Sequence, residues 1–365
     1  MLSRLYGKIT DFRNTLYEKE VLKSFSLGAK TVSIGNITVG GTGKTPLVAF
    51  VARNLAKSGE KVCILTRGYG RENPKKRVLV SDGETILAAV KQAGDEPLEL
   101  ARKLLGAAIV VADANRVAAA KWAREKFGAT VFVLDDAFQH RKAKRDLDVV
   151  ILDGTNPFGN FKILPAGILR ESLSELKRAD LIVISRANLA ENAEKTKRKI
   201  REYNPRCPIF TSENRISELI ELKKFNAETQ MRENAMKKSN FHLNFNENEL
   251  PVNSENSEIR NYEIKDKKAL AFCALGNPNN FFEMLRRENF NLIATEIFPD
   301  HHFYSRKDIE KLEKTAASTG AEILLTTAKD GVKLKDLQFD ASCFVVETEL
   351  FFDDQENFLK VLRSI

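Results

Sequence analysis

Short apolar runs alternate with amphipathic segments along most of the chain. The amphipathic segments repeat apolar residues every three or four positions, which is typical of helices packed on one side. The pattern predicts strands at 31–34, 61–66, 77–80, 107–111, 131–134, 149–152 and 179–185, and helices at 44–57, 84–92, 96–105 and 116–126. Because strands that are apolar throughout are covered on both faces, we expect an α/β fold with a mostly parallel sheet between two layers of helices.

The pattern changes at 221–268, which is rich in Asn, Glu and Lys and has little periodicity. We interpret this region as a polar insertion or linker. The alternation then resumes, with strands at 269–275, 292–298, 322–326 and 343–346 and helices at 281–287 and 307–318. The predicted domains are an N-terminal helix (1–28), an α/β core (29–220), the polar insertion (221–268) and a smaller C-terminal α/β lobe (269–365).

The N-terminal segment has an apolar stripe with helical spacing. Its members are Leu2, Leu5, Tyr6, Ile9, Phe12, Leu16 and Tyr17, and basic residues lie mainly on the other faces. A helix of this kind lies in the headgroup layer of a membrane or packs its stripe against the protein's own core. The pattern alone leaves both alternatives open.

Composition and charge indicate the kind of partner and the cellular compartment of the protein. The net charge of +8 over 365 residues favours an acidic partner, which is a phosphate, a nucleic acid or an anionic membrane surface. Four dispersed cysteines without a Cys-x-x-Cys pair are expected to be reduced packing residues. We expect neither a transmembrane helix nor a signal peptide, because no apolar stretch approaches about 18 residues. The sequence therefore predicts a protein of the cytoplasmic side.

A glycine-rich stretch follows the predicted strand 31–34. It consists of Thr38, Val39, Gly40, Gly41, Thr42, Gly43, Lys44 and Thr45. A glycine-rich turn between a strand and a helix directs backbone N–H groups at phosphates, while the lysine adds charge and the threonine hydroxyl a ligand for Mg²⁺. A strict motif would have glycine in place of Thr38. The stretch predicts nucleotide binding and a fold like that of P-loop NTPases, against the alternative of a turn without a ligand.

Two carboxylates, Asp135 and Asp136, end the predicted strand at 131–134. In P-loop proteins an acid at the end of a neighbouring strand holds Mg²⁺, so we expect a metal role for this pair. The sequence does not distinguish which of the two is the ligand. Gln139, His140 and Arg141 follow at once and are candidates for contact with phosphate or acceptor, or for a helix start.

Asp95 and Arg170 each allow two interpretations. Asp95 precedes a predicted helix and is either its N-cap or a base that accepts the proton of an acceptor hydroxyl. Arg170 lies in an apolar loop and either neutralises phosphate charge or forms an ordinary surface salt bridge. Spacing alone favours the N-cap for Asp95 and decides nothing for Arg170.

Asp300, His301 and His302 follow a predicted strand of the second lobe. A histidine pair is more often a surface feature than part of a site. We also expect that a carboxylate–imidazole pair could assemble there when the two lobes close around a substrate.

The motifs together resemble the tetraacyldisaccharide 4′-kinase family. The resemblance covers nearly the whole chain, and the order of the motifs makes it specific. Its pieces are Gly35-Asn-Ile-Thr-Val-Gly-Gly-Thr-Gly-Lys-Thr-Pro, Arg67-Gly-Tyr-Gly, Gly94-Asp-Glu-Pro, Leu134-Asp-Asp-Ala-Phe-Gln-His-Arg, Leu164-Pro-Ala-Gly with Leu169-Arg-Glu, Gly276-Asn-Pro, Phe298-Pro-Asp-His-His and Thr326-Thr-Ala-Lys-Asp.

The resemblance implies a lipid kinase of lipid A biosynthesis that uses ATP and Mg²⁺. It would transfer the γ-phosphate to the 4′-hydroxyl of an acylated glucosamine disaccharide 1-phosphate. The stretch from Thr38 to Thr45 would hold ATP, and Thr45, Asp135 and Asp136 would organise Mg²⁺. Asp95, His301 and Arg170 would be catalytic, while Gln139, His140 and Arg67 would contact acceptor or phosphate.

An acylated acceptor also favours a peripheral position on the cytoplasmic face of the bacterial inner membrane, with the N-terminal helix on the anionic surface. Two rival functions are weaker. A GTPase switch would carry Asn-Lys-x-Asp, whereas Lys329 and Asp330 are adjacent. A nucleic-acid-binding protein is suggested by charge alone, so we expect no nucleic acid and no obligate protein partner.

Overall fold

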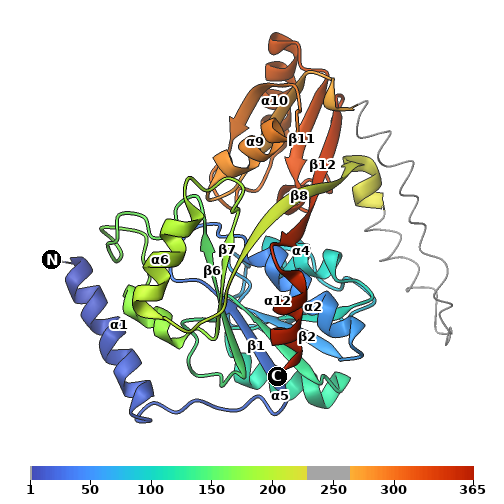
Figure 1. Ribbon diagram of the computed structural model, residues 1–365. Helices are drawn as coiled ribbons and strands as arrows, with labels where there is room; N and C mark the ends of the chain where they lie inside the picture. Colours follow the sequence, from blue (N-terminus) through green and yellow to red (C-terminus); the bar gives the residue numbers. More distant parts are fainter. Residues whose placement is uncertain (1, 228–263) are drawn as a thin grey trace. The chain divides into compact units, whose positions relative to one another are not determined.

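The computed structural model describes residues 2–227 and 264–365 (Figure 1). The chain forms two compact units. The first comprises Met1–Glu84, Lys91–Asn214 and Leu350–Ile365, and the second comprises Thr85–Val90 and Arg215–Glu349. Two strands, β8 (Ile209–Glu221) and β12 (Ser342–Phe352), begin in one unit and end in the other.

The first unit is built on a mostly parallel sheet, as predicted. Its strands are β1 (Lys30–Gly35), β2 (Val62–Thr66), β3 (Val78–Ser81), β4 (Ala108–Ala112), β5 (Val131–Asp135), β6 (Leu147–Asp153), β7 (Leu181–Ser185) and the start of β8. They lie in the order β8-β7-β6-β1-β5-β2-β4-β3, and only the edge strand β3 is antiparallel to its neighbour. The α/β fold with the arrangement of P-loop NTPases is confirmed.

Helices cover both faces of this sheet. The helices of this unit include α1 (Leu2–Glu18), α2 (Lys44–Lys57), α4 (Asp95–Lys103), α5 (Arg116–Phe127), a 3₁₀ turn (Leu173–Arg178), α6 (Ala193–Tyr203) and α12 (Gln355–Arg363). Local sequence sets their ends. In α5, the Asn115 side chain accepts a hydrogen bond from the N–H of Ala118, and Gly128 ends the helix in the left-handed conformation.

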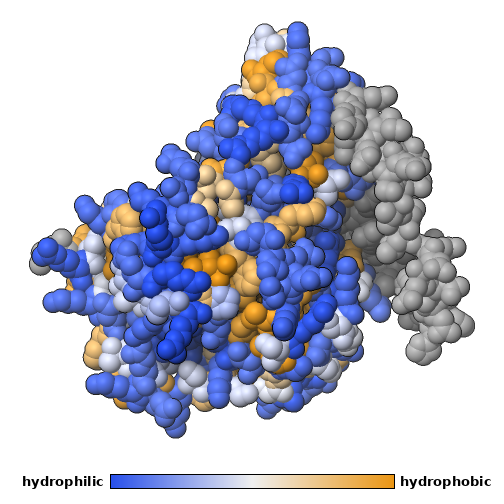
Figure 2. Space-filling view, viewed as in Figure 1, coloured by the Kyte–Doolittle hydropathy of each residue, from blue (hydrophilic) through white to orange (hydrophobic). Residues whose placement is uncertain are grey.

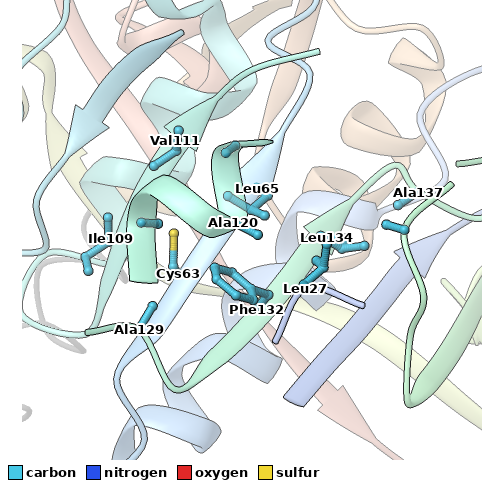
Figure 3. Close-up of a cluster of buried hydrophobic side chains, with 13 residues drawn as sticks. Leu27, Cys63, Leu65, Ile109, Val111, Ala120, Ala129, Phe132, Leu134 and Ala137 are labelled. Atoms are coloured by element: carbon cyan, nitrogen blue, oxygen red, sulfur yellow. The ribbon is translucent and has the colours of Figure 1, made fainter. Parts of the chain in front are cut away.

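Strand register places one hydrophobic layer under α5 (Figure 3). Cys63 pairs with Phe132 and Leu65 with Leu134, so these side chains share one face of β2 and β5. Each is buried, and burial of a side chain such as Phe132 contributes about 2–3 kcal/mol to folding. The layer continues toward α6, whereas α2 packs on the opposite face through Leu47, Val48 and Val51, among others.

The second unit contains a smaller parallel sheet, with the order β10-β9-β11-β12. Its strands are β9 (Ala269–Cys273), β10 (Leu292–Ile297), β11 (Ile323–Thr327) and most of β12, and its helices include α9 (Pro278–Arg287), α10 (Arg306–Thr319) and the short α11 (Ala328–Gly331). A capping box of Ser305 and Asp308 starts α10. The alternation predicted for this part of the chain is therefore present.

The structure differs from the predicted boundaries at the C-terminal end. Residues Leu350–Ile365 belong to the first unit, although periodicity grouped them with the C-terminal lobe. The ring of Phe358 on α12 packs against Phe50, Phe210 and Phe352, all within the first unit. An amphipathic helix such as α12 presents an apolar face that suits either lobe, so its pattern could not identify its partner.

One helix prediction is wrong, and one strand is missed. The helix predicted at 84–92 is reduced to α3 (Val90–Ala93), because residues Thr85–Val90 pack with the second unit and tertiary contacts outweigh helix propensity there. Strand β8 was not predicted, since its alternating polar residues lack an apolar run. Of the predicted insertion 221–268, residues 228–263 lie outside the described part of the chain.

The four cysteines are free and buried, as expected, and burial raises the pKa of the Cys207 and Cys273 thiols to about 12. Within residues 2–227 and 264–365, no helix has both the length and the apolar character needed to cross a bilayer.

Candidate active site

Strand β1 marks the switch point of the first sheet. It pairs with β5 on one side and with β6 on the other, and the chain builds the sheet outward in both directions from there. Ligands of α/β proteins bind beyond the carboxyl ends of the strands at such a point. The glycine-rich stretch leaves β1 at this end, so topology places it where a ligand is expected.

Glycine gives this loop its conformation and an open side. Gly40 and Gly43 have φ of 102° and 87°, which disfavour any side chain. A Cβ atom on Gly40 or Gly41 would meet no atom within 4 Å. Gly43 is the N-cap of α2, so the first N–H groups of that helix and the positive end of its dipole face this open side.

Buried hydroxyl and amide groups support the loop from the protein side. Ser185 Oγ, on β7, donates to the Thr42 carbonyl at 2.8 Å, and Asn36 Nδ2 donates to Thr42 Oγ1 at 3.0 Å. The Val39 N–H donates to the Ile168 carbonyl at 2.8 Å. Thr38 is also buried. Because the N–H of Val39 is already bonded to another part of the protein, the open part of the loop begins at Gly40.

Two cations surround one carboxylate beside the loop. Arg170 Nη1 lies 2.8 Å from Asp136 Oδ1 and 3.0 Å from Oδ2, and Lys44 Nζ lies 3.5 Å from Oδ1. Burial alone would raise the pKa of Asp136, but Lys44 and Arg170 lower it below its usual range. Asp136 has φ of 50°, a left-handed conformation that turns its side chain away from the line of β5.

Asp135 occupies a different environment from its neighbour. It is buried, and Thr66 Oγ1 donates to its Oδ2 at 2.8 Å. Burial raises its pKa to about 7, and the nearby charges of Glu96 and Asp136 act in the same direction. Asp136 is the more open of the two carboxylates and the one that contacts Lys44. The predicted pair therefore divides into an open and a hydrogen-bonded member.

Acidic groups near the loop fit a divalent cation that phosphates help to hold. Among the described residues, no three His, Cys, Asp or Glu side chains form a ready-made metal site. Mg²⁺ is usually bound by one or two carboxylates, waters and substrate phosphates, so a full protein cage is not required. The repulsion that Glu96 and Asp136 exert on Asp135 is the feature that a cation would relieve.

Gln139 and His140 are both partly buried. Gln139 Nε2 donates to the Asn36 carbonyl at 2.8 Å and to Glu171 Oε1 at 2.7 Å, and Arg170 Nη1 lies 3.4 Å from its Oε1. Burial lowers the pKa of His140 to about 4, helped by Arg116 and Arg145 among the nearby cations. Gln139 thus acts as a support for the charged residues.

Two glycine motifs interlock next to Asp95. A Cβ on Gly68 would lie 2.7 Å from the Ala93 carbonyl oxygen, and a Cβ on Gly94 would lie 2.6 Å from the Tyr69 carbonyl oxygen. Gly94 is the N-cap of α4, so Asp95 is the first helical residue and not the N-cap that spacing favoured. Asp95 is buried, and its Oδ1 accepts from the Glu96 N–H at 2.9 Å. Arg67, before Gly68, is exposed.

In the second unit, the two histidines after β10 differ in their surroundings. His302 Nε2 lies 3.2 Å from Asp308 Oδ2, and its ring stacks on Phe298 with a centroid distance of 5.0 Å. His301 has φ of 61°, and its Nε2 lies 3.8 Å from Asp300 Oδ2. His302 is therefore a packing residue, while His301 has the strained backbone that occurs at functional positions.

Helix α1 exposes its apolar stripe. Its large hydrophobic residues Leu2, Leu5, Tyr6, Ile9 and Phe12 are between 39% and 70% exposed. Gly7, Thr10 and Asn14 form the buried side instead. Figure 2 shows a surface that is mostly hydrophilic, with scattered hydrophobic areas. Leu16 and Tyr17, the last two members of the stripe, are half-buried, so most of the stripe, though not all of it, is turned away from the protein's own core.

Comparison with known proteins identifies the family. A family model described as tetraacyldisaccharide-1-P 4'-kinase matches residues 1–365. A tetraacyldisaccharide 4'-kinase of Halothermothrix orenii is 37% identical over 91% of this chain and 81% of its own, and one of Pelobacter propionicus is 34% identical over 100% and 90%. The crystal structure of LpxK from Aquifex aeolicus in complex with ATP has a TM-score of 0.72 at 30% identity and covers 100% of this chain and 96% of that one. The chain therefore belongs to the tetraacyldisaccharide-1-P 4′-kinase family, phosphotransferases of lipid A biosynthesis that phosphorylate a hydroxyl group.

Proposed function

We propose that this protein binds ATP in the loop Thr38–Thr45 and transfers its γ-phosphate to the 4′-hydroxyl of tetraacyldisaccharide 1-phosphate. The observation that carries the proposal is the cluster of Lys44, Arg170 and Asp136 beside an open glycine loop at the start of α2. Phosphoryl transfer depends mainly on positioning and charge neutralisation, and this cluster supplies both. The ATP complex of the Aquifex aeolicus relative supports the nucleotide.

Mg²⁺ would be held by Asp136 together with Thr45 and the phosphates of ATP, with Asp135 close by. Asp136 is favoured as the ligand because its carboxylate is open and charged, whereas that of Asp135 is buried and bonded to Thr66. When bound, the ion neutralises charge on the β- and γ-phosphates. Lys44 and Arg170, which share Asp136 in this structure, are then available to phosphate oxygens.

Asp95 is the proposed general base. It would accept the proton of the 4′-hydroxyl as that oxygen forms its bond to the γ-phosphorus and ADP leaves. Support comes from the interlocked glycines, which hold the first turn of α4 firmly and fix the backbone of Asp95. His301 is the proposed partner of Asp95, as the resemblance to the family implies, and its φ of 61° is the kind of backbone strain that occurs at functional positions.

Helix α1 is proposed to dock on the anionic cytoplasmic face of the inner membrane. Its exposed apolar stripe and basic flanks match an interfacial helix. The acceptor carries four acyl chains, so an enzyme that stays at the bilayer surface avoids extracting them into water. This placement supports a peripheral protein whose substrate comes from the membrane.

The experiment that tests the function follows radiolabelled phosphate from Mg-ATP onto the disaccharide lipid in detergent micelles. We expect transfer by the wild type, and loss of turnover in Lys44→Ala and Asp95→Ala variants that keep their thermal unfolding midpoints. Normal turnover in Asp95→Ala would exclude it as the base.

A separate experiment tests membrane binding. Deletion of residues 1–25 should release the protein from anionic liposomes in a flotation assay, and unchanged flotation would refute the docking role of α1.

A further inference from the structure

One buried polar residue of α1 reaches into the protein. Asn14 is 1% exposed, and its Nδ2 donates to Glu171 Oε2 at 2.8 Å, across 157 positions of the chain. Thr10, on the same buried side, instead donates to the Gly7 carbonyl of its own helix at 2.8 Å. This bond ties the helix to a carboxyl group far away in the chain, and an apolar residue in place of Asn14 would leave that buried group short of a donor.

Glu171 is completely buried and holds several donors in place. Besides Asn14, its carboxyl oxygens accept from Gln139 Nε2 at 2.7 Å and from Arg178 Nη2 at 3.0 Å. Arg178 is itself fixed, with its guanidinium 4.0 Å from the centre of the Phe138 ring. Loss of one donor would leave part of a buried carboxyl group unsatisfied, so the remaining donors would shift toward it.

The network continues from Gln139 to the phosphate site. Gln139 also donates to the Asn36 carbonyl, and Asn36 Nδ2 supports Thr42 of the loop. On its other side, Gln139 Oε1 lies 3.4 Å from Arg170 Nη1, which bonds to Asp136. A continuous series of hydrogen bonds thus runs from the helix with the exposed apolar stripe to the loop and its charged cluster.

We propose that Asn14 is a positioning residue for phosphoryl transfer, acting through Glu171 and Gln139 on Arg170 and the phosphate loop. Packing of α1 against the protein and the correct geometry of the phosphate site then depend on the same hydrogen bonds. The membrane-facing helix is therefore also a structural part of the active site. The proposal rests on the roles proposed above for Arg170 and Asp136. It concerns geometry, because Asn14 itself touches none of the reacting groups.

The test compares Asn14→Ala with Thr10→Ala, a matched truncation on the same buried side of α1. Turnover is measured in detergent micelles at saturating lipid, so that membrane binding is not limiting, and flotation on anionic liposomes is measured separately. We expect Asn14→Ala to lower kcat about tenfold with flotation unchanged, and Thr10→Ala to stay within about twofold in both. A Leu5→Ser/Phe12→Ser variant of the exposed stripe should do the opposite, losing flotation and keeping micellar kcat.

A double-mutant cycle shows whether Asn14 acts through the network. If it does, Asn14→Ala combined with Glu171→Gln is no slower than the slower single variant, whereas independent effects multiply. Gln139→Ala replaces Glu171→Gln in the cycle if the latter does not fold. Wild-type kcat in Asn14→Ala, a loss matched by lost flotation, or multiplicative effects would each overturn the proposal. The Arg170→Ala variant distinguishes failure of the proposed phosphate site from failure of the proposed role of Asn14. Full activity in this variant would refute the phosphate site itself, and not only the role of Asn14.

Discussion

Arg170 and Asp136 lie in direct contact, with Arg170 Nη1 at 2.8 and 3.0 Å from the two carboxyl oxygens. The sequence left Arg170 open between a phosphate ligand and an ordinary salt bridge. Arg170 does form a salt bridge, but it forms it beside the glycine-rich loop, because the carboxylate of Asp136 also lies 3.5 Å from the loop lysine, Lys44. An arriving phosphate or metal ion would have to redistribute these three charges.

Asp136→Asn tests that redistribution. The amide removes the negative charge and keeps the size, so we expect kcat to fall about 100-fold or more with little change in stability. Phosphate transfer to the lipid at several Mg²⁺ concentrations measures the effect. Asp146→Asn is the control, because Asp146 accepts from the Thr31 N–H at the other end of β1 and should leave kcat unchanged. Equal activity of Asp136→Asn and wild type would contradict the assignment.

Gly43→Ala and Gly41→Ala should separate backbone strain from access to the loop. At Gly43, φ of 87° makes alanine unfavourable, so we expect a loss of about 1 kcal/mol in the free energy of unfolding, measured by urea titration. Gly41 carries no such conformation and has open space around it. Its alanine variant should keep wild-type stability and raise the KM for ATP, because the methyl group enters the space proposed for phosphate. Unchanged KM in Gly41→Ala would argue against phosphate binding on that side.

Gly94→Ala should displace the first turn of α4. The added Cβ would lie 2.6 Å from the Tyr69 carbonyl oxygen, and φ of 92° adds backbone strain. Gly106 is the matched control, since its φ of 80° brings similar strain with no atom within 4 Å. We expect about 1 kcal/mol of destabilisation in Gly106→Ala and at least about twice that in Gly94→Ala, with lost turnover only in the latter. Equal losses of stability would show that the contact with Tyr69 can relax.

His140 should make stability depend on pH. The unfolded chain protonates this histidine near its usual pKa of about 6.5, whereas in the folded protein burial and neighbouring cations lower the pKa to about 4. Between these values the unfolded state binds more protons, so folding is weakened as the pH falls. We expect the free energy of unfolding of the wild type, relative to His140→Gln, to drop by about 2 kcal/mol between about pH 7 and pH 5. A difference that is constant over this range would contradict the shift.

Local patterns predicted what local sequence controls. The strands of the first sheet, the helix after the glycine loop and the open loop itself depend on apolar runs, on Pro46 in the first turn of α2 and on glycine conformations. The helix prediction at 84–92 is wrong because tertiary contacts decide that segment, and β8 is missed because its alternating residues form no apolar run. Support residues such as Asn36 and Ser185 were missed, since one polar side chain at a strand end gives no signal of its own.

The sequence by itself determined an α/β protein with a phosphate loop, two acids after a strand and an amphipathic N-terminal helix, because each of these follows from residues close together in the chain. Only the tertiary structure decided that Arg170 pairs with Asp136, that α1 turns its apolar stripe outward and that Asn14 bonds to Glu171. These contacts join residues far apart in sequence. An amphipathic pattern or a single polar residue suits several partners, and only the folded chain selects one.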